Sequence, residues 1–322
     1  MVAGVLATGN AVDAVVAGVF AASALAPSVL LGPVQILIGG AGAGLRAVDG
    51  RNQQPGRRAA RPRGIVAGDP IPEAARVATP ALLAALATCL ASAGSLPLKR
   101  ALGPAIELAR AVSEERARVL KRIAQHGAAA LATQPLAAEL VNAAGRVAGG
   151  LLGLADLDEL RPSVAACEIT RARGRVVATV PWRDAGVRRD ASHVEIVAAT
   201  DARGLVAIAC YEAPDDGLAI AELGLVAPRG ASPVMRGDPR ITPGEARGAA
   251  APIALSEAEG IIDLALGISR SSSGEDGLQE LFDRDDVIFT SAQDGLDENA
   301  TEARVVGIAR SRDTARAIHR RI

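Results

Sequence analysis

Aromatic residues are scarce in this chain of 322 residues. Three Phe, one Trp and one Tyr make up 2% of the sequence, although hydrophobic residues make up 49%. The core must therefore consist of Ala, Val, Leu and Ile, whose small side chains let helices and sheets approach closely. An internal repeat is also lacking. The length is enough for one large domain or for two intimately packed halves.

Net charge is almost absent as well. The formal charge is -1 at pH 7, and the lysines are confined to Lys99 and Lys121, so that Arg is the common cation. A general nucleic-acid binder or membrane-surface binder carries a strong basic excess. The balance of charges therefore argues against both kinds of partner, and we expect neither nucleic acid nor a membrane.

Cysteines are few and scattered. Cys89, Cys167 and Cys210 are odd in number and show no CxxC spacing. This pattern predicts buried free thiols in a reducing compartment, without a disulfide framework. Acidic residues gather only in segments that read as solvated loops, so we expect no metal site and no cofactor.

The apolar stretch from residue 1 to residue 31 could be mistaken for a secretory signal. It lacks the basic start of such a signal, and Asn10 and Asp13 interrupt it at helix-like positions. We therefore interpret it as a buried core helix in a cytoplasmic protein.

The apolar periodicity predicts a helix-rich first half and a strand-rich second half. The glycines between 39 and 44 are not followed by Lys-Ser or Lys-Thr, so they indicate a hairpin turn and not a phosphate loop. Helices are expected at Ala11–Leu25, Pro80–Ala93, Ser113–Gln125, Leu136–Ala148, Glu275–Phe282 and Thr314–Arg321. Strands are expected at Leu45–Val48, Cys167–Arg171, Arg175–Val180, Val194–Ala199, Gly204–Tyr211, Gly217–Val226, Pro252–Leu255, Gly260–Leu266, Val287–Thr290 and Arg304–Ala309.

One junction in the sequence organises the functional interpretation. A charged run ends at Asp190, and an alternating segment that is typical of a half-buried strand begins at Val194. An N-terminal-nucleophile enzyme keeps its attacking Ser, Thr or Cys at the start of such a strand. It cuts its own chain just before that residue and uses the new α-amine as general base. In this sequence Ala191 stands at the position of the nucleophile.

The chain resembles the γ-glutamyltransferase (γ-glutamyltranspeptidase) family. The resemblance rests on Gly9-Asn10-Ala11-Val12-Asp13-Ala14, on Val48-Asp49-Gly50-Arg51, and on the Leu-Pro turn at 96–98 with its following Pro-Ala-Ile segment. It implies an α+β fold, a four-layer αββα N-terminal-nucleophile hydrolase sandwich. Residues 1–190 would match the family's large subunit and residues 191–322 its small subunit, in one intimately packed domain. It also implies that Arg51 holds a substrate α-carboxylate, since a guanidinium binds a carboxylate bidentately.

The chain also departs from the family. After Trp182 only eight residues, 183–190, replace a long helical stretch, so part of the helical subdomain is missing. The family's Thr-Thr-His corresponds to Ala191-Ser192-His193. The segment 243–252, which resembles the Ser-Ser region, has no hydroxyl, and 267–271 lacks the double glycine of the oxyanion hole. Asp238 falls near the family's acidic substrate-binding patch, at a shifted position.

These departures favour a catalytically inactive homologue that stays a single uncut chain. It would act as a binding or scaffolding subunit, as a homo-oligomer or in a complex with another protein. The alternative is a diverged amidohydrolase or acyltransferase. It would act on a γ-glutamyl or other amide-bearing carboxylic acid, with Ser192 as nucleophile, His193 as an assisting group and Arg51 as carboxylate ligand. A third interpretation is a sensor of a small carboxylate or amide ligand.

Overall fold

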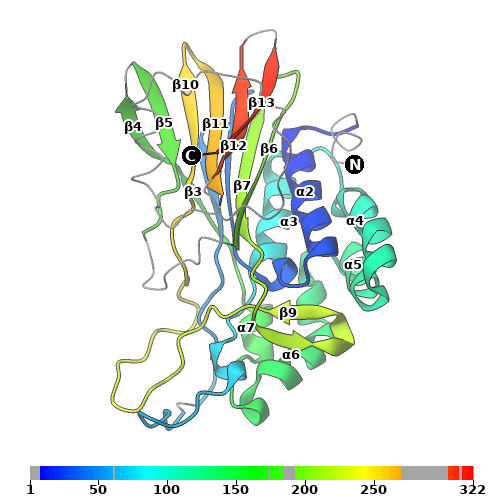
Figure 1. Cartoon of the computed structure of the whole chain (residues 1–322), viewed down its shortest axis with the longest axis vertical. Helices are drawn as coiled ribbons and strands as arrows, with labels where there is room; N and C mark the ends of the chain where they lie inside the picture. The colour runs from blue at the N-terminus through cyan, green and yellow to red at the C-terminus, as the bar shows by residue number, and fades with distance from the viewer. Residues whose placement is uncertain are drawn as a thin grey trace.

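Two antiparallel β-sheets lie face to face, and helices cover the outer face of one of them (Figure 1). The computed structural model of the chain describes residues 8–60, 62–172, 174–183, 193–269, 304–311 and 314–321. The five-stranded sheet has the order β3-β2-β1-β7-β6, and the six-stranded sheet the order β13-β12-β11-β10-β5-β4. The strands of the first sheet are β1 (Val34–Gly39), β2 (Arg46–Gly50), β3 (Ser163–Ala166), β6 (Val194–Thr200) and β7 (Val206–Glu212). Those of the second are β4 (Glu168–Ala172), β5 (Arg175–Thr179), β10 (Ile253–Ala258), β11 (Ile261–Ser269), β12 (Arg304–Arg310) and β13 (Ala315–Arg321).

Alternating side chains fill the space between the two sheets. Leu37 and Ile208 from the first sheet and Ile253 and Leu255 from the second are fully buried in one apolar cluster. Their partners on the opposite face of β1, such as Ile36 and Ile38, belong to the cluster shared with the helices. This period-2 division is what a strand buried on both faces requires.

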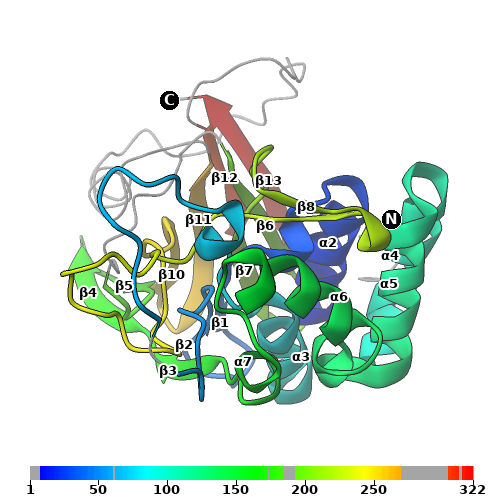
Figure 2. The same ribbon diagram turned by 90° about the horizontal axis from the view of Figure 1, so that it is seen from below.

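The helices lie on the outer face of the five-stranded sheet, as the view from below shows (Figure 2). Helix α2 (Ala11–Leu25) packs on β6 and β7 and is covered in turn by α4 (Leu98–Val112), while α3 (Leu82–Ala93) packs on β2. The apolar residues of α2 surround the helix, because it lies between two layers. The other helices are α5 (Glu114–His126), α6 (Leu136–Ala144) and α7 (Leu154–Asp158), and a small hairpin is formed by β8 (Leu218–Ile220) and β9 (Leu225–Ala227).

The start of α2 shows why the Gly9–Ala14 motif has its polar residues. Asn10 caps the helix and also donates from Nδ2 to the Ala93 carbonyl at 2.7 Å. The fully buried Asp13 carboxylate accepts hydrogen bonds from the Asn10 and Ser95 backbone amides and from the Ser95 hydroxyl. The motif therefore fixes the end of α3 against the start of α2.

The α+β sandwich predicted from the sequence is confirmed, and so is the glycine-rich hairpin turn between β1 and β2. A side chain at Gly40 would place its Cβ 2.0 Å from the Gly204 carbonyl oxygen, so this turn requires glycine. Within the described ranges helices cover only the five-stranded sheet, so three layers are seen. The helix predicted at 275–282 and the strand predicted at 287–290 lie outside those ranges.

Two predictions of local structure were wrong. Thr314–Arg321 was expected to be a helix, but residues 315–321 form strand β13, paired along their whole length with β12. Gly217–Val226 was expected to be one strand, but it folds into the β8–β9 hairpin around a 3-10 turn at Ala221–Leu223. Gly224 closes that turn with a φ of 62°, a left-handed conformation that a single continuous strand does not contain.

Residues 55–60 and 62–70 run beside residues 232–246 and extend with them away from the sheets; we call these segments the arm (Figure 1). Ile65 pairs with Met235 through backbone hydrogen bonds from Ile65 N to Val234 O and from Arg236 N to Ile65 O. At the base of the arm, Gln53 pairs with Ala246. No helix in the described ranges is long and apolar enough to cross a bilayer.

Candidate functional site

The strand register places the predicted site residues at one end of the sandwich. Gly50 pairs with Val34, Val34 pairs with Tyr211, and Tyr211 pairs with Glu195. Arg51 therefore leaves β2 at the same end of the five-stranded sheet at which His193 enters β6. Three strand spacings separate the two positions, about 14 Å at about 4.8 Å each.

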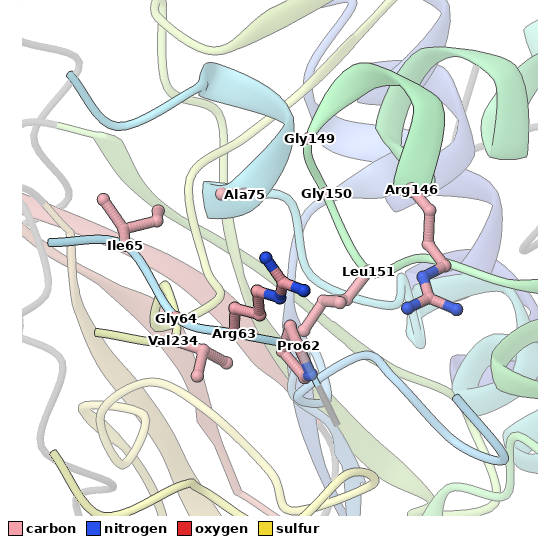
Figure 3. Close-up of a pocket in the computed structure, with 10 residues that line it drawn as sticks. All are labelled: Pro62, Arg63, Gly64, Ile65, Ala75, Arg146, Gly149, Gly150, Leu151 and Val234. Carbon is pink, nitrogen blue, oxygen red and sulfur yellow. The ribbon is translucent and has the colours of Figure 1, made fainter. Parts of the chain in front are cut away.

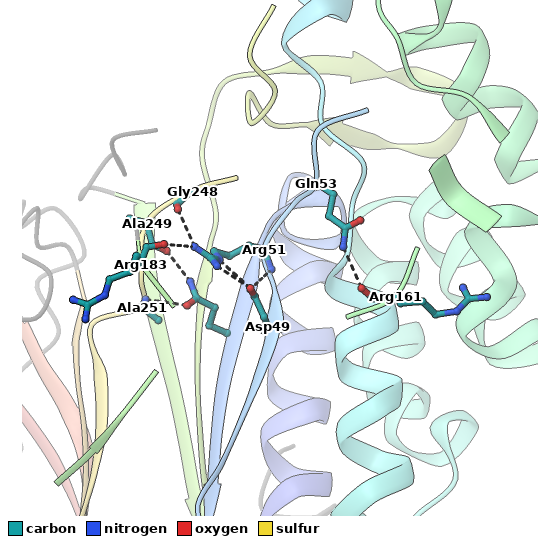
Figure 4. A network of polar contacts seen from close by, with 9 residues as sticks. Asp49, Arg51, Gln53, Arg161, Arg183, Gly248, Ala249 and Ala251 are labelled. Carbon is teal, nitrogen blue, oxygen red and sulfur yellow. Dashed lines mark hydrogen bonds and ion pairs between the residues drawn. The ribbon is translucent and has the colours of Figure 1, made fainter. Parts of the chain in front are cut away.

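Two further segments, which adjoin strands of the second sheet, lie at the same end of the sandwich. Thr179, the last residue of β5, pairs with Ala254 near the start of β10. The residues after β5, Trp182 and Arg183, and the residues before β10 therefore emerge together. Contacts to Arg51 join the ends of the two sheets (Figure 4).

Arg51 is held on several sides by this chain's own groups. Its Nε lies 3.1 Å from both carboxylate oxygens of Asp49, and its Nη2 lies 2.9 Å from Asp49 Oδ2. Nη1 donates to the carbonyls of Arg183 at 2.8 Å and of Gly248 at 3.3 Å. The guanidinium carbon is also 6.0 Å from the centre of the Trp182 ring, and the residue is only 6% exposed.

These contacts use the carboxylate-binding face of Arg51. A guanidinium has five N–H groups, and a carboxylate binds best to two parallel ones. The Nε and Nη2 pair already faces the Asp49 carboxylate, and Nη1 reaches two carbonyls. The Asp49–Arg51 pair is also neutral as a unit, so it offers little attraction to a second carboxylate.

The segment 243–252 lies directly against this arginine. Gln35 on β1 donates from Nε2 to the Ala249 carbonyl at 2.8 Å and accepts from the Ala251 amide at 3.1 Å. The Arg247 amide donates to the Asn52 carbonyl at 2.7 Å. The segment is thus fastened to β1 and to the chain that follows β2, and its backbone forms one wall of the site.

Solved structures resemble this chain over nearly its whole length. One LmbA2991 structure aligns over 99% of this chain and 94% of its own, with a TM-score of 0.70 and 14% identity. The cephalosporin acylase from Bacillus halodurans aligns over 97% and 90%, with a TM-score of 0.66 and 14% identity. This chain has the same fold.

A γ-glutamyltranspeptidase from Pseudomonas nitroreducens aligns over 56% of this chain and 67% of its own, with 20% identity and a TM-score of 0.47. The sequence matches no protein-family model and no curated protein. At sequence identities this low, structural similarity shows a shared fold and nothing more. An activity must be argued from the site.

The sequence resemblance predicts the nucleophile position just before β6. Ala191 and Ser192 lie outside the described residues, and so do 270 and 271 of the segment that resembles the oxyanion turn. His193 is half-buried at the entry of β6, and its carbonyl accepts from the Ala213 amide at 2.9 Å. The roles of Ser192, His193 and Arg51 remain predictions.

Asp238 occupies a different environment. It is exposed in a turn on the arm, three residues beyond the Ile65–Met235 pairing. Its role as a substrate ligand also remains a prediction. In the parts of the chain that the structure covers, no cluster of His, Cys, Asp and Glu has the composition of a metal site.

Sequence reasoning missed the buried polar residues that surround Arg51. Asp49 and Gln35 are 6% and 1% exposed. One signal for Asp49 was present in the sequence. Residues two apart on a strand share a face, so the carboxylate of Asp49 and the guanidinium of Arg51 could have been expected to meet. Gln35 gave no comparable signal, because its partners are more than 200 positions away.

Proposed function

We propose that this protein is a catalytically inactive member of the N-terminal-nucleophile hydrolase fold that serves as a binding or scaffolding subunit. One structural observation carries the proposal. Arg51, the arginine that the sequence resemblance assigns to a substrate carboxylate, is engaged by Asp49 and by two backbone carbonyls.

The sequence supports the same conclusion. Ala191 stands where the resemblance places the nucleophile, and a methyl group can neither attack a carbonyl nor start self-cleavage. The segment 243–252 against Arg51 contains no serine that could assist. A preorganised hydrogen-bond donor in such a site is typically worth about 3 kcal/mol of transition-state stabilisation.

Intact-mass measurement of the purified protein tests the absence of self-cleavage. We expect one chain with the full mass of 32.6 kDa. We also expect the variant Ala191→Thr to stay uncut, because the hydroxyl alone does not restore the other groups. Two polypeptides that arise from a cut on either side of residue 191, in either protein, would overturn the proposal.

Two half-exposed apolar residues support a scaffolding role. Val164 on β3 and Ile169 on β4 are 50% and 48% exposed, and each belongs to the edge strand of its sheet among the described strands. Light scattering coupled to size exclusion tests self-association. If the protein assembles through these edges, Ile169→Lys lowers the measured mass towards 32.6 kDa, whereas Val112→Lys, a change at an exposed position on α4, does not.

The second candidate is a diverged amide hydrolase that uses Ser192 and His193. Two observations favour it. His193 and Arg51 emerge at the same end of one sheet, and one protein with this fold is named a cephalosporin acylase. The deciding assay is hydrolysis of a γ-glutamyl anilide. An activity that Ser192→Ala abolishes and Ser163→Ala preserves would establish the enzyme, and its absence in the native protein would exclude this substrate class.

A further inference from the structure

A pocket lies beside the Ile65–Met235 pairing of the arm, and Arg51 is not part of its lining. Its walls come from the arm at 62–65 and at Val234, from Ala75, and from the turn Arg146–Leu151 (Figure 3). The cavity volume is about 250 Å³, roughly the liquid volume of eight water molecules at about 30 Å³ each. A cavity of this volume can hold a small ligand with one short aliphatic chain.

The lining divides into two chemical types. Five residues provide apolar surface, namely Pro62, Ile65, Ala75, Leu151 and Val234. Among the described residues of the lining, only Arg63 and Arg146 are charged, and none is acidic. Within the described part of the chain, neither guanidinium has a hydrogen bond or an ion pair. Two cations without internal partners, next to an apolar floor, are the chemical complement of an organic anion.

The placement of the two arginines narrows the class of ligand. Figure 3 shows Arg63 and Arg146 on either side of Leu151, each extending from a different segment. A ligand with an anionic group at each end could reach both guanidiniums while its middle covers the leucine. A compact anion such as phosphate would leave the apolar surface uncovered.

The backbone around the pocket is tightly constrained. A Cβ at Gly150 would lie 2.0 Å from the Ala144 carbonyl oxygen, and one at Gly64 would lie 2.9 Å from the Arg236 amide nitrogen. Gly64 and Gly149 also have positive φ values of 76° and 88°, which glycine adopts without strain. The backbone that carries Arg63 and Arg146 therefore packs closely against neighbouring segments, while the two arginine side chains are exposed to solvent.

We propose that this pocket binds a short aliphatic dicarboxylate, with Arg63 at one end, Arg146 at the other and Leu151 beneath the methylene chain. Each guanidinium would donate hydrogen bonds to one carboxylate. The proposal is independent of the Arg51 site and of the question of catalysis.

Isothermal titration with adipate and with hexanoate tests the proposal, because the two probes share a six-carbon chain and differ by one carboxylate. We expect adipate to bind about tenfold more tightly than hexanoate, the effect of one charge-assisted contact. Arg63→Gln and Arg146→Gln should each lower the adipate affinity about tenfold, to the level of hexanoate. Binding should also weaken as salt is added.

Matched variants separate a site from a general charge effect. Arg100→Gln removes one exposed arginine on α4, outside the pocket, and should leave adipate binding unchanged. Ala75→Leu fills the pocket and should abolish binding of both probes, while circular dichroism confirms that the variant is folded. The proposal is overturned if adipate does not bind, if it binds no better than hexanoate, or if Arg100→Gln weakens it as much as Arg63→Gln does.

Discussion

At the scale of single residues, the Asp49 carboxylate determines what Arg51 can bind. An arginine in the same position with open N–H groups would attract a substrate carboxylate, whereas this one is paired two residues back along its own strand. The sequence alone shows that an arginine stands at position 51. Whether its N–H groups are open to a ligand depends also on the carbonyls of residues 183 and 248. Those contacts arise only when the two sheets meet, so local sequence reasoning could not supply them.

The cysteines also gain their properties from burial. All three are buried and none is in a disulfide, as the sequence predicted. Burial disfavours the thiolate, so the pKa of Cys167 is raised to about 12 and that of Cys89 is raised further. We predict that a thiol reagent at pH 8 reacts with none of the three in the native protein within minutes, and with all of them after unfolding in urea. Fast reaction of the native protein would contradict this burial.

The raised pKa values of Cys89 and Cys167 predict that the folded protein loses stability at alkaline pH. An unfolded thiol ionises near pH 9, while the folded thiol stays protonated to higher pH. Above pH 9 the unfolded state therefore binds fewer protons than the native state. The free energy of unfolding then falls by up to about 1.4 kcal/mol per pH unit for each buried thiol. Urea titrations at pH 8, 9 and 10 measure this, and Cys89→Ala should reduce the slope relative to the native protein.

At the scale of secondary-structure elements, regular apolar patterns were predicted well. The helix at 11–25 matches α2, and the hairpin that turns near Gly174 matches β4 and β5. The helix prediction for the C-terminal segment failed because its Ala and Arg residues have high helix propensity, although its pairing partner β12 ends at Arg310, just before it. Register with β12 and burial of Ile318 on the sheet favour the strand, a tertiary override that intrinsic propensity cannot reveal.

Helix α5 provides a direct test of how an element is anchored. Arg116 is 6% exposed and donates to the carbonyls of Ala24, Leu25 and Gly224, so it ties α5 to the end of α2. Burial lowers its pKa, and it remains charged at neutral pH. We predict that Arg116→Ala lowers the free energy of unfolding by about 3 kcal/mol, because buried carbonyls lose a charged donor.

The control for this prediction lies on the same helix. Arg118 is 67% exposed and pairs with Glu115 on the surface. Such a pair contributes about 0.5 kcal/mol or less, so Arg118→Ala should leave the urea midpoint nearly unchanged. Equal losses for the two variants would show that the contacts of Arg116 do not anchor α5.

At the scale of the whole molecule, the two halves predicted from the sequence are interleaved. In the five-stranded sheet, β1 from the first half pairs with β7 from the second. In the six-stranded sheet, β5 pairs with β10 in the same way. Each half therefore contributes to both sheets, and the cluster between the sheets draws side chains from both. The second half alone has no α-helix among its described elements with which to cover the five-stranded sheet.

This interleaving predicts how the chain behaves when it is divided. Expressed alone, the fragment 1–190 would expose the edges of β1 and β5. The fragment 191–322 would expose the edges of β7 and β10. Both fragments would also expose apolar sheet faces, so we expect each to aggregate. Expressed together, they should form a soluble complex that co-purifies through a tag on one fragment, because the pairings need no covalent link. Cooperative unfolding measured by circular dichroism would show that the complex has a native core. If 1–190 alone is monomeric and unfolds cooperatively, the first half folds independently, and the two halves are separate domains instead of one.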